Sequence, residues 1–544
     1  MKIKLIYVPR LYEEHRYSYA PKHHYLPPMG IAVLKTVLEN HGFVVDIDDL
    51  DVKVNKLSNL DLSIFDNIYN IAGLLEGNDK IEKAKKNKGP MEKARKMIKY
   101  IDIEDYDLIG LSLVSEMNIS AIGTAISLAR IIKEKSKCNI VLGGIHFDEH
   151  PLSPRDYLKN NYIDYIIGGQ GITPFLNLCY SLKENNWQKY DLNRVFSRKK
   201  ISAGNKSINH KQIPPPSFEG LPIDLYKYNP QEESIDICDD INCEDEILML
   251  PYMFMKGCPM RCAFCGFSND NDVKYKDLNE VVKDLKFLKG KYNANAFFFL
   301  NSNINPSYDY AKRFVNKLID NKIDILWSSC AYIGNLDKKL IKQMRKAGAV
   351  RLIFGVESGS NKMLNLIDKG FNIKKAEDIL RQCNKTGIWT EIELISGMPY
   401  EKNGDIKKTL NFLDNNRKNI NFAYLNKFIL KDSRFKERSN EFNLKIHGKL
   451  KTILFNKEGR LKLLDGYHST ITKFDELHGL KWPKKNMQIN ESFERIRDFI
   501  YNDLLAEKGK LQYYHPTGNL PLLFYLYDKL GEKDKIESLL YGNT

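Results

Sequence analysis

The amino-acid sequence predicts an α/β protein with two parallel-sheet domains followed by a mostly helical C-terminal region. In two long stretches, short apolar runs alternate with segments whose apolar residues recur every three or four positions, which is typical of strands alternating with amphipathic helices. A proline-rich and then acidic segment separates the two stretches. We therefore expect four regions: a doubly wound, Rossmann-like domain over residues 1–200, a linker over 201–247, a partial barrel over 248–450 and a C-terminal cap over 451–544.

Composition limits the classes of protein to which the chain can belong. With 544 residues, 43% of them hydrophobic and 28% charged, it has the composition of a globular protein with room for several domains. No apolar run approaches a membrane span and the N-terminus is unlike a signal peptide, so we expect a cytoplasmic protein without a membrane partner. The net charge of +14 fits an anionic ligand or merely a lysine-rich surface, and the basic–aromatic strands of RNA-binding proteins are not evident.

The first 200 residues alternate strands and helices, with a polar, lysine-rich and largely helical insertion at about residues 54–100. We expect strands at 2–8, 43–47, 108–113, 140–144 and 164–167, and helices at 29–40, 119–133 and 173–182. Parallel sheets of this kind bind ligands at the carboxyl ends of their strands, where glycines let a ligand approach the backbone. The candidate ligand-binding residues at these ends are Ser112, Ser115, Gly143, Gly144, His146, Gly169 and Gly171.

From residue 248 the alternation resumes and predicts a partial (β/α)6 barrel of the TIM type. We expect strands at 248–255, 296–300, 323–328, 351–356, 389–395 and 422–429, and helices at 278–288, 308–319, 338–347, 376–385 and 406–414. Catalytic groups of such barrels lie at the carboxyl ends of the strands. Beyond residue 450 we expect helices at 493–505 and 520–530, in a cap over the barrel mouth.

A C-x3-C-x2-C motif follows the first barrel strand. Its members are Cys258, Cys262 and Cys265, three of the nine cysteines. Clustered thiols in a cytoplasmic protein indicate metal binding rather than disulfides. The residues alone leave open three unrelated thiols or one of two kinds of metal centre. One is a zinc site completed by a distant Cys or His, and the other is an iron–sulfur cluster in which three thiolates leave one iron open.

The motif, with Phe264 directly before its third cysteine, resembles that of the radical S-adenosylmethionine (SAM) enzymes. The barrel strand tips Gly355-Val-Glu-Ser-Gly359 and Gly397-Met-Pro399 resemble the SAM-binding tips of that family. The resemblance implies that the three cysteines hold a [4Fe–4S] cluster, that Glu357 faces the ribose hydroxyls, and that Asn301 lies near the methionine amino group. The residues it implies in SAM binding are Phe264, Gly266, Asn301, Glu357, Ser358 and Gly397.

The N-terminal domain resembles the cobalamin-binding domain that precedes the radical domain in one class of these enzymes. The matching segments are Pro27–Gly30, Gly110–Ser112, Gly143–His146 and Gly168–Gly171. The resemblance implies that cobalamin binds at the candidate ligand-binding residues named above. The D-x-H-x-x-G motif of other cobalamin proteins is absent, so no histidine of that loop is expected on the cobalt.

The resemblance implies reductive cleavage of SAM with electrons from a flavodoxin or ferredoxin. It further implies methyl transfer from cobalamin to an unactivated carbon of a small metabolite or peptide. Two alternatives stay open. One is a radical rearrangement, cyclisation or crosslinking without methylation, and the other is a metal-containing nucleic-acid-binding or regulatory module. The sequence singles out no general base and no radical-quenching residue.

Overall fold

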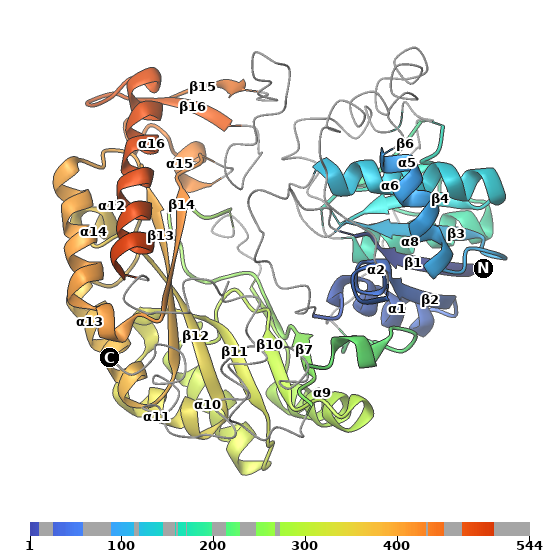
Figure 1. Cartoon of the computed structure of the whole chain (residues 1–544), viewed down its shortest axis with the longest axis horizontal. Helices are drawn as coiled ribbons and strands as arrows, with labels where there is room; N and C mark the ends of the chain where they lie inside the picture. Colours follow the sequence, from blue (N-terminus) through green and yellow to red (C-terminus); the bar gives the residue numbers. More distant parts are fainter. Residues whose placement is uncertain are drawn as a thin grey trace. The chain divides into compact units, whose positions relative to one another are not determined.

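The computed structural model separates the described part of the chain into two compact units. The first contains the described residues up to Tyr226, and the second those from Lys227 onward. Each is built around one six-stranded sheet (Figure 1). The described residues are 1–9, 26–57, 89–113, 119–144, 158, 161–169, 171–198, 214–228, 246–266, 273–430, 433–450 and 471–504.

The sheet of the first unit confirms the expected doubly wound fold. Its strands are β1 (Lys2–Tyr7), β2 (Val44–Asp49), β3 (Leu108–Ser112), β4 (Asn139–Gly143), β5 (Tyr165–Ile167) and β6 (Val195–Ser197), in the order β2-β1-β3-β4-β5-β6. All neighbouring pairs are parallel except β5 and β6. The chain winds outward in both directions from β1, which makes the carboxyl ends of β1 and β3 the topological switch point where ligands bind in such sheets.

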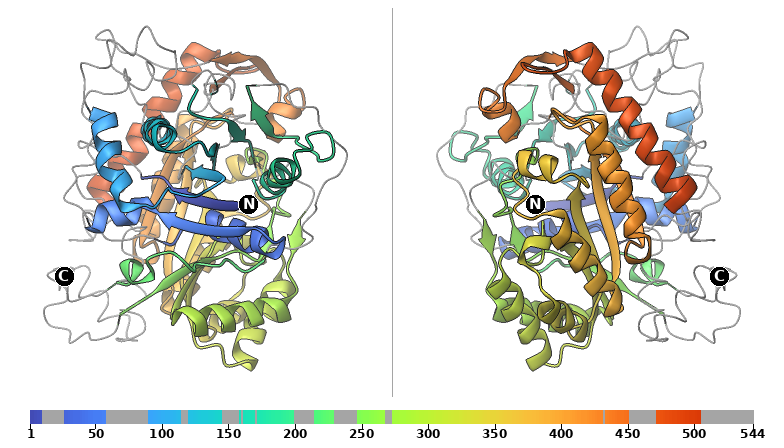
Figure 2. Two further views of the ribbon diagram at one scale, coloured as in Figure 1. Left: turned by 90° about the vertical axis from the view of Figure 1, so that its right-hand side faces the viewer. Right: turned by 90° about the vertical axis from the view of Figure 1, so that its left-hand side faces the viewer.

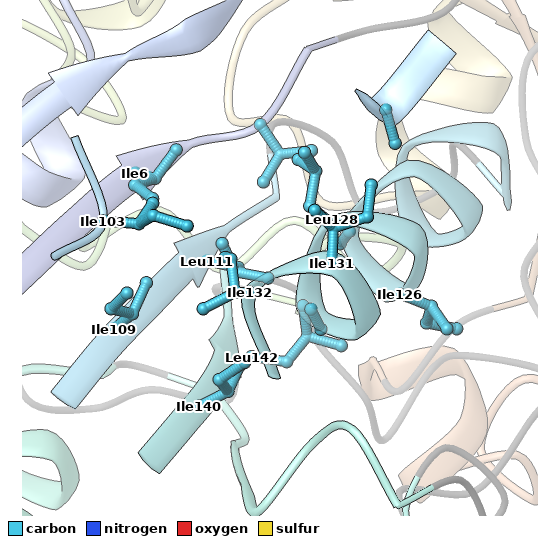
Figure 3. Packing of buried hydrophobic residues seen from close by; sticks show 14 of the residues in the cluster. Ile6, Ile103, Ile109, Leu111, Ile126, Leu128, Ile131, Ile132, Ile140 and Leu142 are labelled. Carbon is cyan, nitrogen blue, oxygen red and sulfur yellow. The ribbon is translucent and has the colours of Figure 1, made fainter. Parts of the chain in front are cut away.

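The helices of this unit include the three that the sequence predicts. Their bounds are α1 (Met29–Asn40), α2 (Leu50–Leu57), α5 (Gly89–Met97), η1 (Ile98–Tyr100), α6 (Ile119–Lys135), α8 (Ile172–Glu184) and η3 (Ile223–Tyr226). Helix α5 starts at Gly89-Pro90, since proline suits the first turn of a helix. Isoleucines and leucines of α6 pack on those of β3 and β4, as Figure 3 shows for Ile132, Leu111 and Leu142, which are at most 1% exposed.

The second unit confirms the partial barrel. Its six parallel strands are β7 (Met249–Tyr252), β10 (Ala296–Phe299), β11 (Leu326–Ala331), β12 (Ala349–Glu357), β13 (Trp389–Ser396) and β14 (Phe422–Lys427), and they neighbour one another in sequence order. The helices are α9 (Leu278–Tyr292), α10 (Tyr308–Asp320), α11 (Lys338–Lys346), α12 (Asn361–Leu366), α13 (Ile373–Lys385) and α14 (Asn403–Asn415), with η5 (Ile333–Asn335) and η6 (Arg417–Asn419). Most of them line the outer face of the sheet (Figure 1).

The C-terminal region is not only helical where the structure describes it. A hairpin of β15 (Leu444–Leu450) and β16 (Ile471–Glu476) precedes α16 (Trp482–Phe499), which continues as the π-helix η7 (Ile500–Leu504). Helix α16 lies beside α14 (Figure 2) and also packs on β13 and β14. The helix expected at 520–530 lies outside the described residues. No helix of the described segments combines the length and apolar character needed to cross a membrane.

Alternation along the barrel strands places different chemistry on the two faces of the sheet. On the outer face, Phe299 and Trp327 pack against Phe314 of α10. The inner face carries a buried ion pair in which Nε of Arg351 donates to Oε1 of Glu391 over 2.6 Å. Both side chains are at most 1% exposed, so each charge depends on the other.

Replacing Arg351 alone should destabilise the second unit strongly. In Arg351→Met the buried Glu391 carboxylate loses its charged partner, and removal of one member of such a pair costs about 3–5 kcal/mol. Urea unfolding followed by tryptophan fluorescence measures the loss. The double variant Arg351→Met with Glu391→Leu should recover most of it, because neither charge of this pair remains. A single variant as stable as the unchanged chain would contradict this dependence.

Candidate functional site

The cysteine motif lies on a loop that backbone hydrogen bonds fix at both ends. Gly257 enters the loop with a φ of +77°, a left-handed conformation that favours glycine. Further along, the N–H of Ala263 donates to the carbonyl of Ile367 over 2.9 Å, and its carbonyl accepts from the N–H of Phe435 over 3.0 Å. Short pairing of β8 (Met255–Lys256) with β9 (Lys274–Tyr275) holds the chain before the loop. The loop is therefore a shaped element on which thiols can be presented.

The three thiols of the loop can act as ligands. None is in a disulfide; Cys262 is buried, and Cys258 and Cys265 are half-buried. Burial raises the pKa of the Cys262 thiol to about 11, with Lys369 acting against this and Glu357 and the two other cysteines adding to it. Within the described segments, no three or more Cys, His, Asp or Glu side chains are grouped to hold a single metal ion. In a four-iron cluster each thiolate binds its own iron, so its ligands need not converge on one point.

Glu357, at the end of β12, is paired with a lysine that the sequence did not single out. Its Oε1 accepts from Nζ of Lys369 over 2.8 Å, and both side chains are nearly buried. The φ of Glu357 is +69°, a strained conformation for a residue with a side chain. A Cβ on Gly355 would lie 2.4 Å from Oε1 of Glu357, so the glycine leaves the room that the carboxylate occupies.

Lys369 joins this carboxylate to the cysteine loop. Its Nζ lies 5.6 Å from the centre of the Phe264 ring, and its charge acts on the Cys262 thiol. Burial lowers the pKa of Lys369, but Glu357 and Cys262 outweigh it and the net shift is upward, so the side chain is a cation. No motif marks this lysine in the sequence, because its place beside the cysteines arises from the turn after α12.

The two asparagines at the tip of β10 each keep one buried amide atom without a hydrogen-bond partner. Oδ1 of Asn301 accepts from the N–H groups of Phe254 and Met255 at 3.0 and 3.1 Å, which leaves the Nδ2 donor unpaired. Nδ2 of Asn303 donates to Sγ of Cys258 over 3.3 Å, which leaves the Oδ1 acceptor unpaired. Unpaired polar atoms in a buried place are costly, so a polar ligand beside the cysteine loop would be stabilised by bonding to them.

The remaining residues implicated in SAM binding have different surroundings. The Ser358 hydroxyl lies 3.3 Å from that of Thr409 and accepts from the N–H of Ser360, so it braces the strand tip. Gly397 is buried with a φ of +85°, and its N–H donates to Oε2 of Glu401 over 2.6 Å. Gly266 is exposed at the end of the described loop, while Phe264 is half-buried.

A further carboxyl group, that of Glu393, lies on the inner face of β13. Its side chain is accessible to solvent, although neighbouring protein atoms displace part of the water around its carboxyl group. Burial, Glu357 and Glu391 raise the pKa of Glu393 to about 7, while Lys369 and Arg351 act to lower it. No motif marks Glu393 in the sequence, although its spacing of two residues from Glu391 and from Ile395 on β13 could have placed it on the inner face.

The Glu393 carboxyl should make the stability of this unit depend on pH. Its folded pKa of about 7 exceeds the ordinary value of 4.5, so between these pH values the folded state binds more protons than the unfolded state and loses stability as pH rises. Glu393→Gln removes this loss. Thermal unfolding of the metal-free protein should show that the Tm of the variant rises relative to the Tm of the unchanged chain between about pH 5 and about pH 8. An equal Tm difference at both pH values would contradict the shift.

In the first unit, the described candidates gather at the carboxyl edge of the sheet. Ser112 ends β3, Gly143 ends β4, and Gly144 follows with a φ of +88°. A Cβ on Gly144 would lie 2.5 Å from the carbonyl oxygen of Leu113, so only glycine fits there. Gly169 and Gly171 flank the turn between β5 and α8, whereas Ser115 and His146 lie outside the described residues.

The fold and the cysteine loop agree with a comparison against known families. The model of the radical SAM superfamily matches residues 252–413, from the last residue of β7 into α14. This stretch is a radical SAM domain, as the cysteine spacing and the strand tips predicted.

Individual relatives are distant. The chain is 24% identical over 316 residues to an uncharacterized methyltransferase of Pyrococcus horikoshii, covering 57% of this chain and 64% of the relative. It is 24% identical over 317 residues to the anaerobic magnesium-protoporphyrin IX monomethyl ester cyclase of Rubrivivax gelatinosus, covering 56% and 53%. The chain thus spans less than two thirds of the length of either relative.

Among solved structures, the fold is similar to that of the radical SAM methyltransferase TsrM from Kitasatospora setae with cobalamin and a [4Fe–4S] cluster bound. The TM-score is 0.53 at 14% identity, and the match covers 82% of this chain and 77% of TsrM. The likeness of fold therefore extends well beyond the radical SAM domain.

Proposed function

We propose that this protein is a cobalamin-dependent radical SAM methyltransferase acting on an unactivated carbon of a small metabolite or peptide. The observation that carries the proposal is the meeting of the three-cysteine loop with the Glu357–Lys369 pair and the two unpaired asparagine amide atoms. The fold likeness to a cobalamin-bound methyltransferase and the methyltransferase relative support it.

Each group near the loop has a task that its free atoms permit. Cys258, Cys262 and Cys265 would hold the cluster. The unpaired acceptor Oδ1 of Asn303 suits the ammonium of SAM, and the unpaired donor Nδ2 of Asn301 suits its carboxylate. This changes the task expected of Asn301, since backbone N–H groups already occupy its acceptor oxygen.

The Glu357–Lys369 pair, the cluster and the cobalamin would each have a separate role in the reaction. Glu357, with one oxygen held by Lys369, would accept the ribose hydroxyls of SAM. A bound [4Fe–4S] cluster supplies the electron for reductive cleavage of SAM, and bound cobalamin supplies the methyl group. Gly144 and Gly169, both with positive φ, would shape the turns after β4 and β5 at which the cobalamin would bind.

The central test is anaerobic reconstitution with iron and sulfide, followed by mass spectrometry of SAM products in the presence of a reductant. The unchanged chain should form 5′-deoxyadenosine and Cys262→Ala should not, because one cluster ligand is lost. Cys138→Ala, which removes a buried thiol of the first unit, is the matched control and should keep the activity. A colourless protein that leaves SAM intact would overturn the proposal.

Cobalamin dependence is tested in the same reconstitution. Protein that takes up cobalamin and forms S-adenosylhomocysteine beside 5′-deoxyadenosine supports methyl transfer. Protein that cleaves SAM but takes up no cobalamin would overturn the methyltransferase half of the proposal. The cyclase relative keeps ring formation as the second candidate, and the product mass separates the two because only methylation adds a CH2 unit.

The asparagine assignment predicts different defects for the two positions. Asn303→Ala should raise the KM for SAM about tenfold or more, since a hydrogen bond to a charged group is lost. Asn301→Ala should raise the KM for SAM and should also lower the iron content, because Phe254 and Met255 before the cysteine loop lose their shared acceptor. Iron analysis and SAM-dependent kinetics of both variants measure this. Identical effects at the two positions would contradict the assignment.

A further inference from the structure

The tip of β13 is held by a part of the chain that lies outside the radical SAM domain. Residues 397–401 follow β13, and the hairpin strand β16 and helix α16 contact them. Gly397 meets α16 so closely that a Cβ there would lie 2.5 Å from Cγ1 of Ile489. Nε2 of Gln488, also on α16, donates to the carbonyl of Glu401 over 2.6 Å.

Lys485 is the centre of these contacts. Its side chain is fully buried, and its Nζ donates to the carbonyl of Met398 over 2.6 Å and to Oε1 of Gln488 over 3.0 Å. The same Nζ lies 2.9 Å from Oε1 of Glu476, which in turn accepts from the N–H of Tyr400 over 2.7 Å. One buried cation therefore joins β16, α16 and the strand tip.

The tip itself is closed by a second carboxylate. Oε2 of Glu401 accepts from the N–H of Gly397, which folds the five residues back on themselves. Burial raises the pKa of Glu401 to about 7, while the Gly397 N–H and Lys485 act in the opposite direction. The shape of the tip thus depends on this internal bond and on hydrogen bonds to Lys485, Gln488 and Glu476 of the C-terminal region.

The contacts continue from this tip to that of β12. Oδ1 of Asp405, at the start of α14, accepts from the Ser360 hydroxyl over 2.7 Å, and Oδ2 accepts from Nζ of Lys362 over 2.7 Å. Lys362 also donates to the carbonyl of Tyr400 over 2.7 Å. The Gly359 N–H donates to the Thr409 hydroxyl over 3.0 Å. These bonds link the tip that α16 holds to the tip that carries Glu357.

We propose that Lys485 is a positioning residue for SAM, and that β16 and α16 complete the SAM site by holding the β13 tip in its binding shape. Because α16 begins beyond residue 413, the radical SAM domain alone would lack this support. The proposal rests on the proposed function, since it needs Gly397 and Glu357 to face SAM.

The experiment compares SAM binding and cleavage in Lys485→Met and the matched control Lys484→Met in the full reconstituted chain. Both remove one lysine from α16, but Lys484 is exposed. Lys485→Met should weaken SAM binding about tenfold or more, as expected for the loss of charge-assisted hydrogen bonds. Its iron content should stay unchanged. Lys484→Met should bind SAM as the unchanged chain does, and Lys485→Arg should recover part of the affinity.

Gln488→Leu keeps the test decisive if Lys485→Met does not fold, because it removes only the bonds to Glu401 and Lys485. It should raise the KM for SAM several-fold with little change in kcat. Normal SAM affinity in a folded Lys485→Met, or in Gln488→Leu when Lys485→Met is unfolded, would overturn the inference while the proposed function stands. An unchanged chain that neither binds nor cleaves SAM would overturn both.

Discussion

The buried ion pair of Glu357 and Lys369 is the interaction on which the site depends. It places a carboxylate at the end of β12 and a cation beside the cysteine loop, and it does so in a place from which water is largely excluded. Each charge stabilises the other, so neither can leave without a large cost. The strained backbone of Glu357 and the missing Cβ at Gly355 are the local conditions that this pairing requires.

Around this pair, the barrel brings together groups that are far apart in the chain. Asn301 ties the tip of β10 to the backbone before the cysteine loop, and Ile367 ties the turn after α12 to the loop itself. The inner face below them carries its own neutralised pair, Arg351 and Glu391. Glu393 is left as a carboxyl with a pKa near neutrality on the same face. The site is thus an arrangement of paired charges with a few atoms left unpaired for ligands.

The C-terminal region belongs to this arrangement in spite of lying outside the family domain. Its hairpin and long helix contact the β13 tip through a fully buried lysine. Burial disfavours the cation and lowers the pKa of Lys485, while Glu476 and Glu401 act to raise it. Support of a strand tip by a distant segment is one way in which a barrel holds its binding loops more rigidly than the loops alone allow.

The sequence by itself predicted the two parallel sheets, most of their strands and the cysteine motif. Periodicity fixes strands such as β12 and helices such as α1, and the cysteine spacing is local, so no folding is needed to recognise it. The sequence did not reveal β6 or the β15–β16 hairpin, because short or half-buried strands carry little alternation. Only the tertiary structure placed Lys369 and Lys485, because the acceptors that surround each lysine come from distant parts of the chain and meet it only after folding.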